Sequence, residues 1–600
     1  MNNNPPSYEQ KIITALLHVL LCSGFIVLVF QNAWTGDDAY ISFRSLEQLY
    51  AGNGPRWNSI DRVQVYTSPL WFWLLAFLRW FSSDVYVNAI AFSLLLNLIL
   101  VIYCMRQLVK PVFAVLMLSA LMLSNSFMDY TTSGLENPLM YLLLAVFVTH
   151  YYRAFAQPSR SSLAPLLMTA ALLLITRHDL LIIIFIPLLF FIMRNPLLLS
   201  LREKIKFVFF LLLPLALWTL FSLAYYGLPF PNTAYAKLHL NIPCLQLIDQ
   251  GLFYFIYGIK HDIISIALLV AGFFFLATRI HNQPYQIIAL SISCGCAYII
   301  WTGGDFMAGR FYSHLVFVAV YCSVLNLKEQ GTFKIKTLEW LGLALMALSA
   351  VYVFYYPHTP FDPPLDHPKM YFQKGVSDER LLYFSDACIW RYLDHSKPYF
   401  PDSYLADEGL KVKNTPVKNR KLPYEQVPNI GVKGYFVGLD TVIIDPYALP
   451  DMFRARLPRS CVSLGTDRTC CWAPGHTPHY NPPLYAESLI AKKPLMPDSS
   501  LNEYFTIISS INQSEKLFSL ERFTHIVLLN LGYYEYLLTS TNKTISDSEP
   551  AEITNCAWGC STEIKPQGCC QDTWKRYNWF FWLSPKLKLH TLTVMLKLWR

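Results

Sequence analysis

Charged residues are scarce in this sequence of 600 residues. Only 15% are Asp, Glu, Lys or Arg, and 54% are hydrophobic, whereas a soluble domain carries about 25% charged residues. The scarcity excludes an ordinary soluble protein and predicts an integral membrane protein. The chain also lacks a Gly-rich phosphate loop and a Rossmann fingerprint. We therefore expect neither a soluble nucleotide donor nor a nucleic-acid partner.

Membrane-length apolar runs are absent after residue 356, so we expect the membrane part to end there. The runs predict about eleven transmembrane helices in an α-helical, polytopic protein. They lie near 12–30, 86–104, 111–126, 138–152, 163–176, 178–193, 205–225, 262–278, 284–300, 312–326 and 338–356. The first run has no small-x-small cleavage site after it, so we expect a retained helix rather than a signal peptide.

The apolar stretch 68–81 is interpreted differently. A span there would move every later loop to the opposite side of the membrane, against the distribution of basic residues. We therefore expect a helix that lies on the outer membrane surface. Its large aromatic side chains would sit at the level of the headgroups; they are Trp71, Phe72, Trp73 and Trp80.

Basic residues predict the orientation, because loops rich in Lys and Arg stay in the cytoplasm. They cluster at Lys11, Arg106 and Lys110, Arg153 and Arg160, Arg194 to Lys206, Arg279, and Lys328 to Lys336. The odd number of spans then places the C-terminal region outside. We expect a transmembrane domain over 1–356 in a bacterial inner membrane, and a mixed α/β extracytoplasmic (periplasmic) domain over 357–600.

Eight of the fourteen cysteines fall in that C-terminal region. They are Cys388, Cys461, Cys470, Cys471, Cys556, Cys560, Cys569 and Cys570. An even number of cysteines in an oxidising compartment predicts disulfide bonds, whose pairing the sequence leaves open. Zinc is the alternative, given the spacing of the last four, but no His accompanies them.

Asp37 and Asp38 directly follow the first apolar run. Two adjacent carboxylates at a membrane boundary repel each other and are costly to desolvate. Such a pair suits cation binding or deprotonation of a hydroxyl. The structural alternative is a helix-end cap beside a solvated carboxylate. Glu136, in the second outer loop, has a similar alternative as a turn residue before Pro138.

Three basic residues, Arg177, Lys237 and Arg310, fall on the predicted outer side, against the charge rule. Phosphate is the natural partner of such cations. The alternatives are an Arg177–Asp179 ion pair between two helices, and a Lys237 that extends towards water. Taken together, the basic residues, the acidic pair and the missing nucleotide fold predict group transfer from a lipid phosphate.

Several motifs occur in order along the membrane part. They are Asp37-Asp-Ala-Tyr-Ile, Tyr66-Thr-Ser-Pro-Leu-Trp71, Gly134-Leu-Glu136, Thr176-Arg177, Tyr226-Gly, Pro231-Asn-Thr with Lys237, and Gly303-Gly-Asp-Phe-Met with Gly309-Arg310. This set resembles the GT-C glycosyltransferases, and most closely the branch with the terminal arabinofuranosyltransferases of mycobacterial cell-wall assembly. In the C-terminal region, Asp445-Pro-Tyr-Ala-Leu-Pro-Asp451 also resembles the outer domain of that branch.

The resemblance implies a GT-C fold with its active site on the outer face. It also implies a polyprenyl-phosphate-linked sugar as donor, and inverting transfer to a cell-envelope glycan or lipid-linked acceptor. Asp37 or Asp38, with preference for Asp37, would be the general base. The donor phosphate would be bound by Arg310, Arg177 and Lys237, and the substrates would be contacted by Glu136, Asn232, Asp305, Tyr40 and Tyr66. Metal dependence varies among such enzymes, so a divalent cation as cofactor is left open.

Two other functions compete with this one. A flippase or transporter of a lipid-linked glycan would need polar residues at the middle of its spans, whereas here they gather at one end. A non-catalytic envelope-assembly protein could bind glycan through its aromatic residues. That function would leave the outer acidic pair unexplained.

Overall fold

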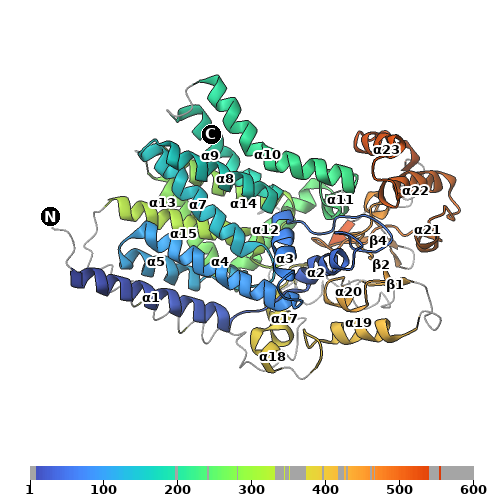
Figure 1. Ribbon diagram of the computed structural model, residues 1–600, viewed down its shortest axis with the longest axis horizontal. Coiled ribbons are helices and arrows are strands. Elements are labelled where there is room, and N and C mark those ends of the chain that lie inside the picture. Colours follow the sequence, from blue (N-terminus) through green and yellow to red (C-terminus); the bar gives the residue numbers. More distant parts are fainter. Residues whose placement is uncertain are drawn as a thin grey trace.

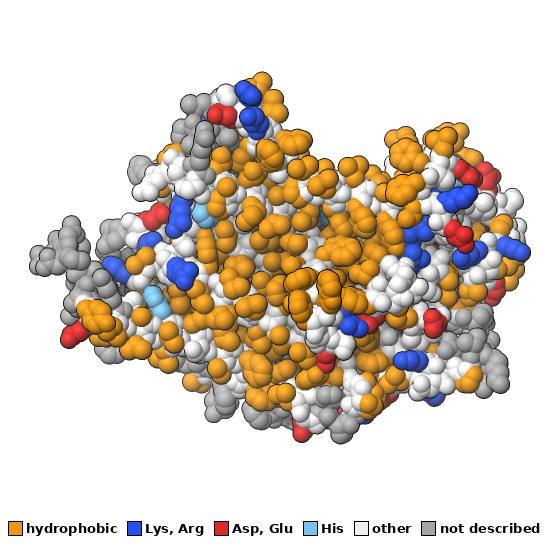
Figure 2. Space-filling view, in the orientation of Figure 1, with side chains coloured by type: hydrophobic (Ala, Val, Ile, Leu, Met, Phe, Trp, Pro, Cys, Tyr) orange, Lys and Arg blue, Asp and Glu red, His pale blue; other side chains and the backbone are white. Residues whose placement is uncertain are grey.

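Long helices form a bundle at one end of the computed structural model, and the C-terminal elements gather at the other end (Figure 1). The structure describes residues 8–195, 200–238, 242–279, 282–330, 344, 351, 373–394, 397–416, 424–427, 430–459, 462–464, 467–538 and 553–555. Hydrophobic side chains cover most of the visible bundle face, and the charged ones gather at its two ends (Figure 2). This distribution suits a lipid environment around the bundle.

Six helices within the described ranges are long and apolar enough to cross a membrane. They are α1 (Tyr8–Gln31), α4 (Val85–Leu108), α7 (Asn137–Ala156), α10 (Leu201–Tyr225), α14 (Gln283–Trp301) and α15 (Arg310–Gln330). A seventh span results if α12 (Cys244–His261) and α13 (Ile263–Ala277), which meet at a bend of 112°, count as one. The set is compatible with a polytopic membrane protein.

The predicted count of eleven spans is not confirmed. The predicted run 338–356 lies almost entirely outside the described residues. Other predicted runs form helices shorter than a straight span needs; these are α5 (Pro111–Met122), α8 (Arg160–Thr176) and α9 (Leu181–Arg194). The apolar runs did not predict α12, because polar residues such as Asp249 and Gln250 interrupt its apolar pattern.

The stretch 68–81 contains α3 (Pro69–Arg79), whose eleven residues are too few for a span. Proline at its first position fits a helix start, where a backbone N–H would have no partner. The prediction that its aromatic residues all face headgroups is wrong for Trp71 and Phe72, which are buried in the bundle core. Trp80, by contrast, is 79% exposed.

Local capping explains where several long helices begin. Asp84 accepts a hydrogen bond of 3.0 Å from the Val87 N–H and so caps α4. Ser200 and Glu203 form a reciprocal capping box at the start of α10. Each arrangement satisfies backbone donors that a helix N-terminus leaves free.

The C-terminal region mixes short strands with helices. Its helices are α17 (Glu379–Ala387), α18 (Ile389–Asp394), α19 (Tyr404–Asn414), α20 (Val432–Phe436), η5 (Arg454–Arg456), α21 (Tyr485–Ala491), α22 (Ser499–Asn512) and α23 (Leu520–Asn530). β1 (Tyr424–Gln426) pairs in parallel with β2 (Val442–Ile444). β4 (Asp467–Trp472) pairs antiparallel with β3 (Val462–Leu464) and parallel with β5 (Ile553–Asn555).

This region packs directly onto the loops of the bundle. Its segment at Ser377 forms a parallel bridge with Met307, and Cys388 forms an antiparallel bridge with Trp34. Val63 and Leu228 of the membrane part share one hydrophobic cluster with residues of α21, α22 and α23. The two predicted domains therefore share packed cores, which fixes the position of C-terminal loops over the bundle end.

The predicted disulfides fall mostly outside what the structure describes. Cys388 is buried and unpaired. Cys470 and Cys471 lie in β4, but their side chains are not among those described. The remaining five cysteines lie outside the described residues; they are Cys461, Cys556, Cys560, Cys569 and Cys570. Disulfide bonds between them stay a prediction.

Candidate functional site

A chain of ion pairs joins the ends of four helices, on the side of the bundle that faces the C-terminal region. Arg310, the first residue of α15, lies 3.5 Å from an Asp38 carboxylate oxygen and 3.4 Å from Glu136 Oε1. Arg177, which caps the C-terminus of α8, lies 3.4 Å from the same Glu136 oxygen and 2.6 Å from Asp179 Oδ2. Two predicted phosphate ligands thus share one carboxylate, and the alternative Arg177–Asp179 ion pair is also present.

Arg310 keeps an unused donor in this chain. Its side chain is only 10% exposed, and its Nε–H has no hydrogen-bond partner among the described residues. One terminal nitrogen contacts the Met307 sulfur at 3.2 Å, which is a weak acceptor. A buried guanidinium N–H without a partner is costly, so this donor is a candidate contact for an anionic ligand.

The loop before Arg310 is held in one conformation by its glycines and its neighbours. Gly303, Gly304 and Gly309 have positive φ angles of 86°, 74° and 79°, which glycine adopts without steric cost. The Tyr254 hydroxyl donates to the Met307 carbonyl at 2.9 Å, and the Tyr130 hydroxyl donates to Ala308 at 2.8 Å. The parallel bridge at Ser377 adds two backbone bonds, each 2.8 Å. Arg310 is therefore presented from a rigid support.

Asp305 lies within this loop and is almost fully buried. Its Oδ1 accepts from the Phe306 N–H at 2.9 Å, whereas its Oδ2 finds no donor among the described residues. Burial raises the pKa of Asp305, and the nearby charges of Arg310 and Lys237 oppose that rise. The unpaired oxygen is a candidate acceptor for a sugar hydroxyl.

Asp37 differs from its neighbour because its contacts come from the C-terminal region. The carboxylate accepts a 2.7 Å hydrogen bond from the Val432 N–H at the start of α20. Gly431 lies so close that a Cβ there would be 2.2 Å from Asp37 Oδ2. Burial raises the pKa of Asp37 to about 7, the Val432 hydrogen bond lowers it, and the Asp38 charge raises it. Such a carboxylate can take up a proton near neutral pH.

The loop that carries Glu136 is docked against the first turn of α2 (Asp37–Tyr50). The Gly36 N–H donates to Ser133 at 2.9 Å, and the Trp71 indole N–H donates to Gly134 at 3.0 Å. Gly134 has φ of 79°, and a Cβ there would be 2.7 Å from that of Ala39. These contacts fix the separation between Glu136 and the acidic pair.

Lys237 lies at the edge of the cluster rather than in the ion-pair chain. It is the exposed, penultimate residue of α11 (Asn232–Leu238). Its ammonium group is 5.8 Å from the centre of the Phe306 ring and makes no ion pair among the described residues. Its charge opposes the rise that burial causes in the pKa of Asp305. The pKa of His476 falls to about 3 mainly because of burial, and the Lys237 charge lowers it further.

Three predicted substrate contacts have other partners in the structure. Asn232 donates to the carbonyls of Ala448 and Leu449 at 3.0 and 2.9 Å and so fastens the C-terminal region to α11. The Tyr66 hydroxyl shares a 2.8 Å hydrogen bond with Tyr226. Tyr40 is buried and packs edge-on against Phe43 and Tyr435. None of these described contacts involves a residue of the ion-pair chain.

Residues of the C-terminal region near the acidic pair were missed from the sequence. They are Gly431 and Val432, which contact Asp37, and Glu379, whose Oε1 accepts from the Ser377 hydroxyl at 2.7 Å. Burial raises the pKa of Glu379 well above its ordinary value, and the charges of Asp38 and Asp37 raise it further. No local sequence signal marks them, since Val432 follows Asp37 by 395 residues.

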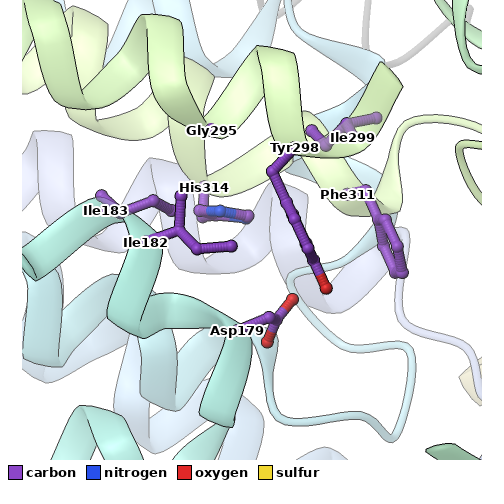
Figure 3. A pocket seen from close by; sticks show the side chains of 8 residues that line it. All are labelled: Asp179, Ile182, Ile183, Gly295, Tyr298, Ile299, Phe311 and His314. Atoms are coloured by element: carbon purple, nitrogen blue, oxygen red, sulfur yellow. The ribbon is translucent and has the colours of Figure 1, made fainter. Parts of the chain in front are cut away.

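A small pocket lies next to Asp179, the residue at the end of the chain of ion pairs (Figure 3). It holds about 250 Å³ of empty space, part of it open to solvent, between η1 (His178–Leu180), α9, α14 and α15. The Tyr298 side chain points towards the Asp179 carboxylate, and Phe311 and His314 line the walls (Figure 3). The guanidinium of Arg177 lies 5.1 Å from the centre of the Phe311 ring.

The acidic residues do not form a metal site within the described ranges. No group of three or more His, Cys, Asp or Glu side chains is arranged there to hold an ion. The arrangement combines a carboxylate whose pKa burial raises to about 7 with two buried guanidinium groups nearby.

No protein-family model matches the chain. A terminal β-(1→2)-arabinofuranosyltransferase of Mycobacterium tuberculosis is 24% identical over 515 residues, which cover 72% of this chain and 80% of that protein. The match supports a distant relationship to a glycosyltransferase. Together with the apolar helices, it supports a membrane-embedded protein with glycosyltransferase activity in general.

Proposed function

We propose that this protein is a GT-C-type glycosyltransferase that uses a polyprenyl-phosphate-linked sugar as donor. The acceptor would be a cell-envelope glycan or a lipid-linked glycan at the outer face of a bacterial inner membrane. The observation that carries the proposal is the pair of buried guanidiniums on Glu136, with an unused Arg310 donor, beside an Asp37 whose pKa is raised to about 7. The distant arabinofuranosyltransferase relative supports the general activity.

In the proposed reaction, Asp37 accepts the proton of the acceptor hydroxyl as its oxygen bonds to the anomeric carbon. The bond between that carbon and the phosphate oxygen breaks, and polyprenyl phosphate leaves with the electron pair. A single displacement of this kind inverts the anomeric configuration. The leaving phosphate gains negative charge, so fixed cations near it stabilise the transition state. Arg310 and Arg177 are the proposed cations, with Lys237 at the edge of the cluster.

The position of the polar cluster favours transfer over transport. Asp38 and Arg310 lie in the first turns of α2 and α15, Glu136 precedes α7, and Arg177 follows α8. All four residues therefore lie at helix ends. A transport path would place such groups along the middle of spanning helices.

The experiment is a turnover assay with the full chain, purified in lipid nanodiscs, and a panel of polyprenyl-phosphate sugars. We expect release of polyprenyl phosphate from at least one donor in the presence of a glycan acceptor. Arg310→Gln should lower kcat by about 10²–10³-fold, because it removes a charged donor to the leaving group. Failure of the wild-type protein to consume any donor of the panel would contradict the proposed class.

Arg279→Gln is the matched control. Arg279 lies before α14, at the end of that helix opposite the Gly303–Arg310 loop, and its guanidinium rests 3.7 Å from the Phe275 ring. The same loss of one positive charge there should leave turnover unchanged. Equal losses in both variants would mean that the Arg310 effect reflects general destabilisation rather than phosphate binding.

A further inference from the structure

One helix of the C-terminal region carries an apolar stripe that the described protein leaves uncovered. On α23, Leu520, Phe523 and Leu531, the residue that caps its end, are 83%, 64% and 76% exposed, and Val527 between them is also exposed. These positions follow the i, i+3, i+7, i+11 spacing of a single helix face. The opposite face, with Ile526 and Leu529, is buried in the C-terminal core.

The stripe continues beyond the helix. Phe518 before it is 91% exposed, and Tyr533 after it is exposed as well. Soluble surfaces rarely show so many large apolar side chains side by side, and such patches mark interaction sites. Leucine and valine side chains have no ring to stack on a sugar, so the stripe fits an aliphatic partner better than a glycan.

The neighbour of α23 indicates which partner that is. Arg522, on the buried side, donates to the carbonyls of Ala224 and Tyr225 at 2.7 and 3.0 Å, which are the last residues of α10. Asn530 donates to the Gly227 carbonyl at 2.9 Å. Hence α23 is fastened along its length to the end of a membrane-length helix, beside α10 in Figure 1.

That end of α10 has a lipid-facing character. Only 17% of the residues in its most apolar stretch are buried in the protein, and Leu217 and Leu220 near its end are exposed. A membrane-length helix with such a surface ends at the boundary between hydrocarbon and headgroups. A second helix held beside this end lies at the depth where amphipathic helices rest on a bilayer.

We propose that α23 is an interfacial helix whose apolar stripe, Leu520, Phe523, Val527 and Leu531, inserts into the lipid leaflet around α10. The C-terminal region is then held at the membrane surface by α23 as well as by its contacts with the bundle loops. The inference rests on the exposure of the stripe and its attachment to α10. It does not depend on the proposed transferase activity.

The test uses the full chain in vesicles of phosphatidylethanolamine and phosphatidylglycerol that contain a phospholipid with a diazirine near the top of an acyl chain. After irradiation, digestion and mass spectrometry locate the lipid adducts. We expect adducts on α23 at a level similar to Leu217 and Leu220, and about tenfold above those on α19, an exposed helix of the same region. Adducts on α23 no more frequent than on α19 would overturn the proposal.

Two variants sharpen the result. Leu520→Glu with Phe523→Glu should remove most α23 adducts, whereas Tyr404→Glu, the same kind of change at an exposed aromatic residue of α19, should leave them in place. A photoreactive benzoylphenylalanine at position 523 gives a second readout. Adducts with phospholipid support the proposal, and adducts with residues 539–600 of the chain or with a second copy overturn it. Thermal unfolding of each variant checks that it folds.

Discussion

Asp37 and Asp38 are consecutive residues, yet the two sides of the candidate site hold them by different means. Asp38 forms an ion pair with the Arg310 side chain. Arg310 in turn pairs with Glu136, and Glu136 with Arg177, and all of these residues belong to the membrane part. Asp37 is held by backbone of the C-terminal region, through the Val432 N–H and the close approach of Gly431. The membrane part thus supplies the charges, and the C-terminal region adjusts the basicity of one carboxylate.

The largest expected effect separates the two carboxylates directly. Asp37→Asn removes the proposed base and should lower kcat for sugar transfer by about 10²–10⁴-fold. Asp38→Asn should cost about fivefold at most, because a partly exposed ion pair contributes about 1 kcal/mol or less. Initial rates at saturating donor concentration measure kcat of both variants. The variants are first matched for expression and thermal unfolding. A larger loss in the Asp38 variant would reverse the assignment.

An intermediate effect tests how the C-terminal region positions Asp37. Gly431→Ala introduces a Cβ 2.2 Å from Asp37 Oδ2, so the carboxylate or the loop has to move. A displacement of about 1 Å at a reacting group costs about 10²-fold in rate. We expect a loss of that order in kcat with little change in the KM for the donor, whose phosphate is bound elsewhere.

The control for this variant is Gly24→Ala in α1, where a Cβ meets nothing within 4 Å. A pH profile gives a readout that a merely structural role would not move. Displacement of Val432 weakens a hydrogen bond that lowers the pKa of Asp37, so the acidic limb of the Gly431→Ala profile should shift to higher pH. A loss of activity with an unchanged limb would contradict the positioning role.

The smallest effect is a shift in the pH profile caused by one carboxylate acting on the other. Asp37 has to be deprotonated to act as a base, so kcat/KM should rise with pH through about 7. The Asp38 charge raises the pKa of Asp37, and Asp38→Asn removes it. The acidic limb of this variant should therefore move to lower pH. A limb that stays in place would show that the two carboxylates do not interact.

The sequence predicted the charged partners better than the contacts that position them. Arg177, Arg310 and Glu136 stood out because charge is unusual beside apolar runs, and the structure brings them together. Asn232 stood out equally, but its amide is used to fasten the C-terminal region to α11. A polar side chain in a loop looks the same in sequence whether its partner is a ligand or a carbonyl.

The fold shows a similar division. Continuous apolar runs predicted α1, α4, α7, α10, α14 and α15, because hydrophobic length is a local property. The helix α12 escaped notice, since its polar face interrupts the run. The contacts of Gly431 and Val432 with Asp37 could not be predicted, because they depend on how loops hundreds of residues apart meet in space.

The parallel bridge between Met307 and Ser377 has a consequence for exchanging parts between related chains. A chimera that joins this bundle to a foreign C-terminal region would lose the backbone partners of Phe306 and Ala308, both of which come from Ser377. It would also need a glycine in register with Gly431, since any side chain there collides with Asp37. The two parts are therefore expected to be interchangeable only when the segments that carry Ser377 and Gly431 are transplanted together with the loops they touch.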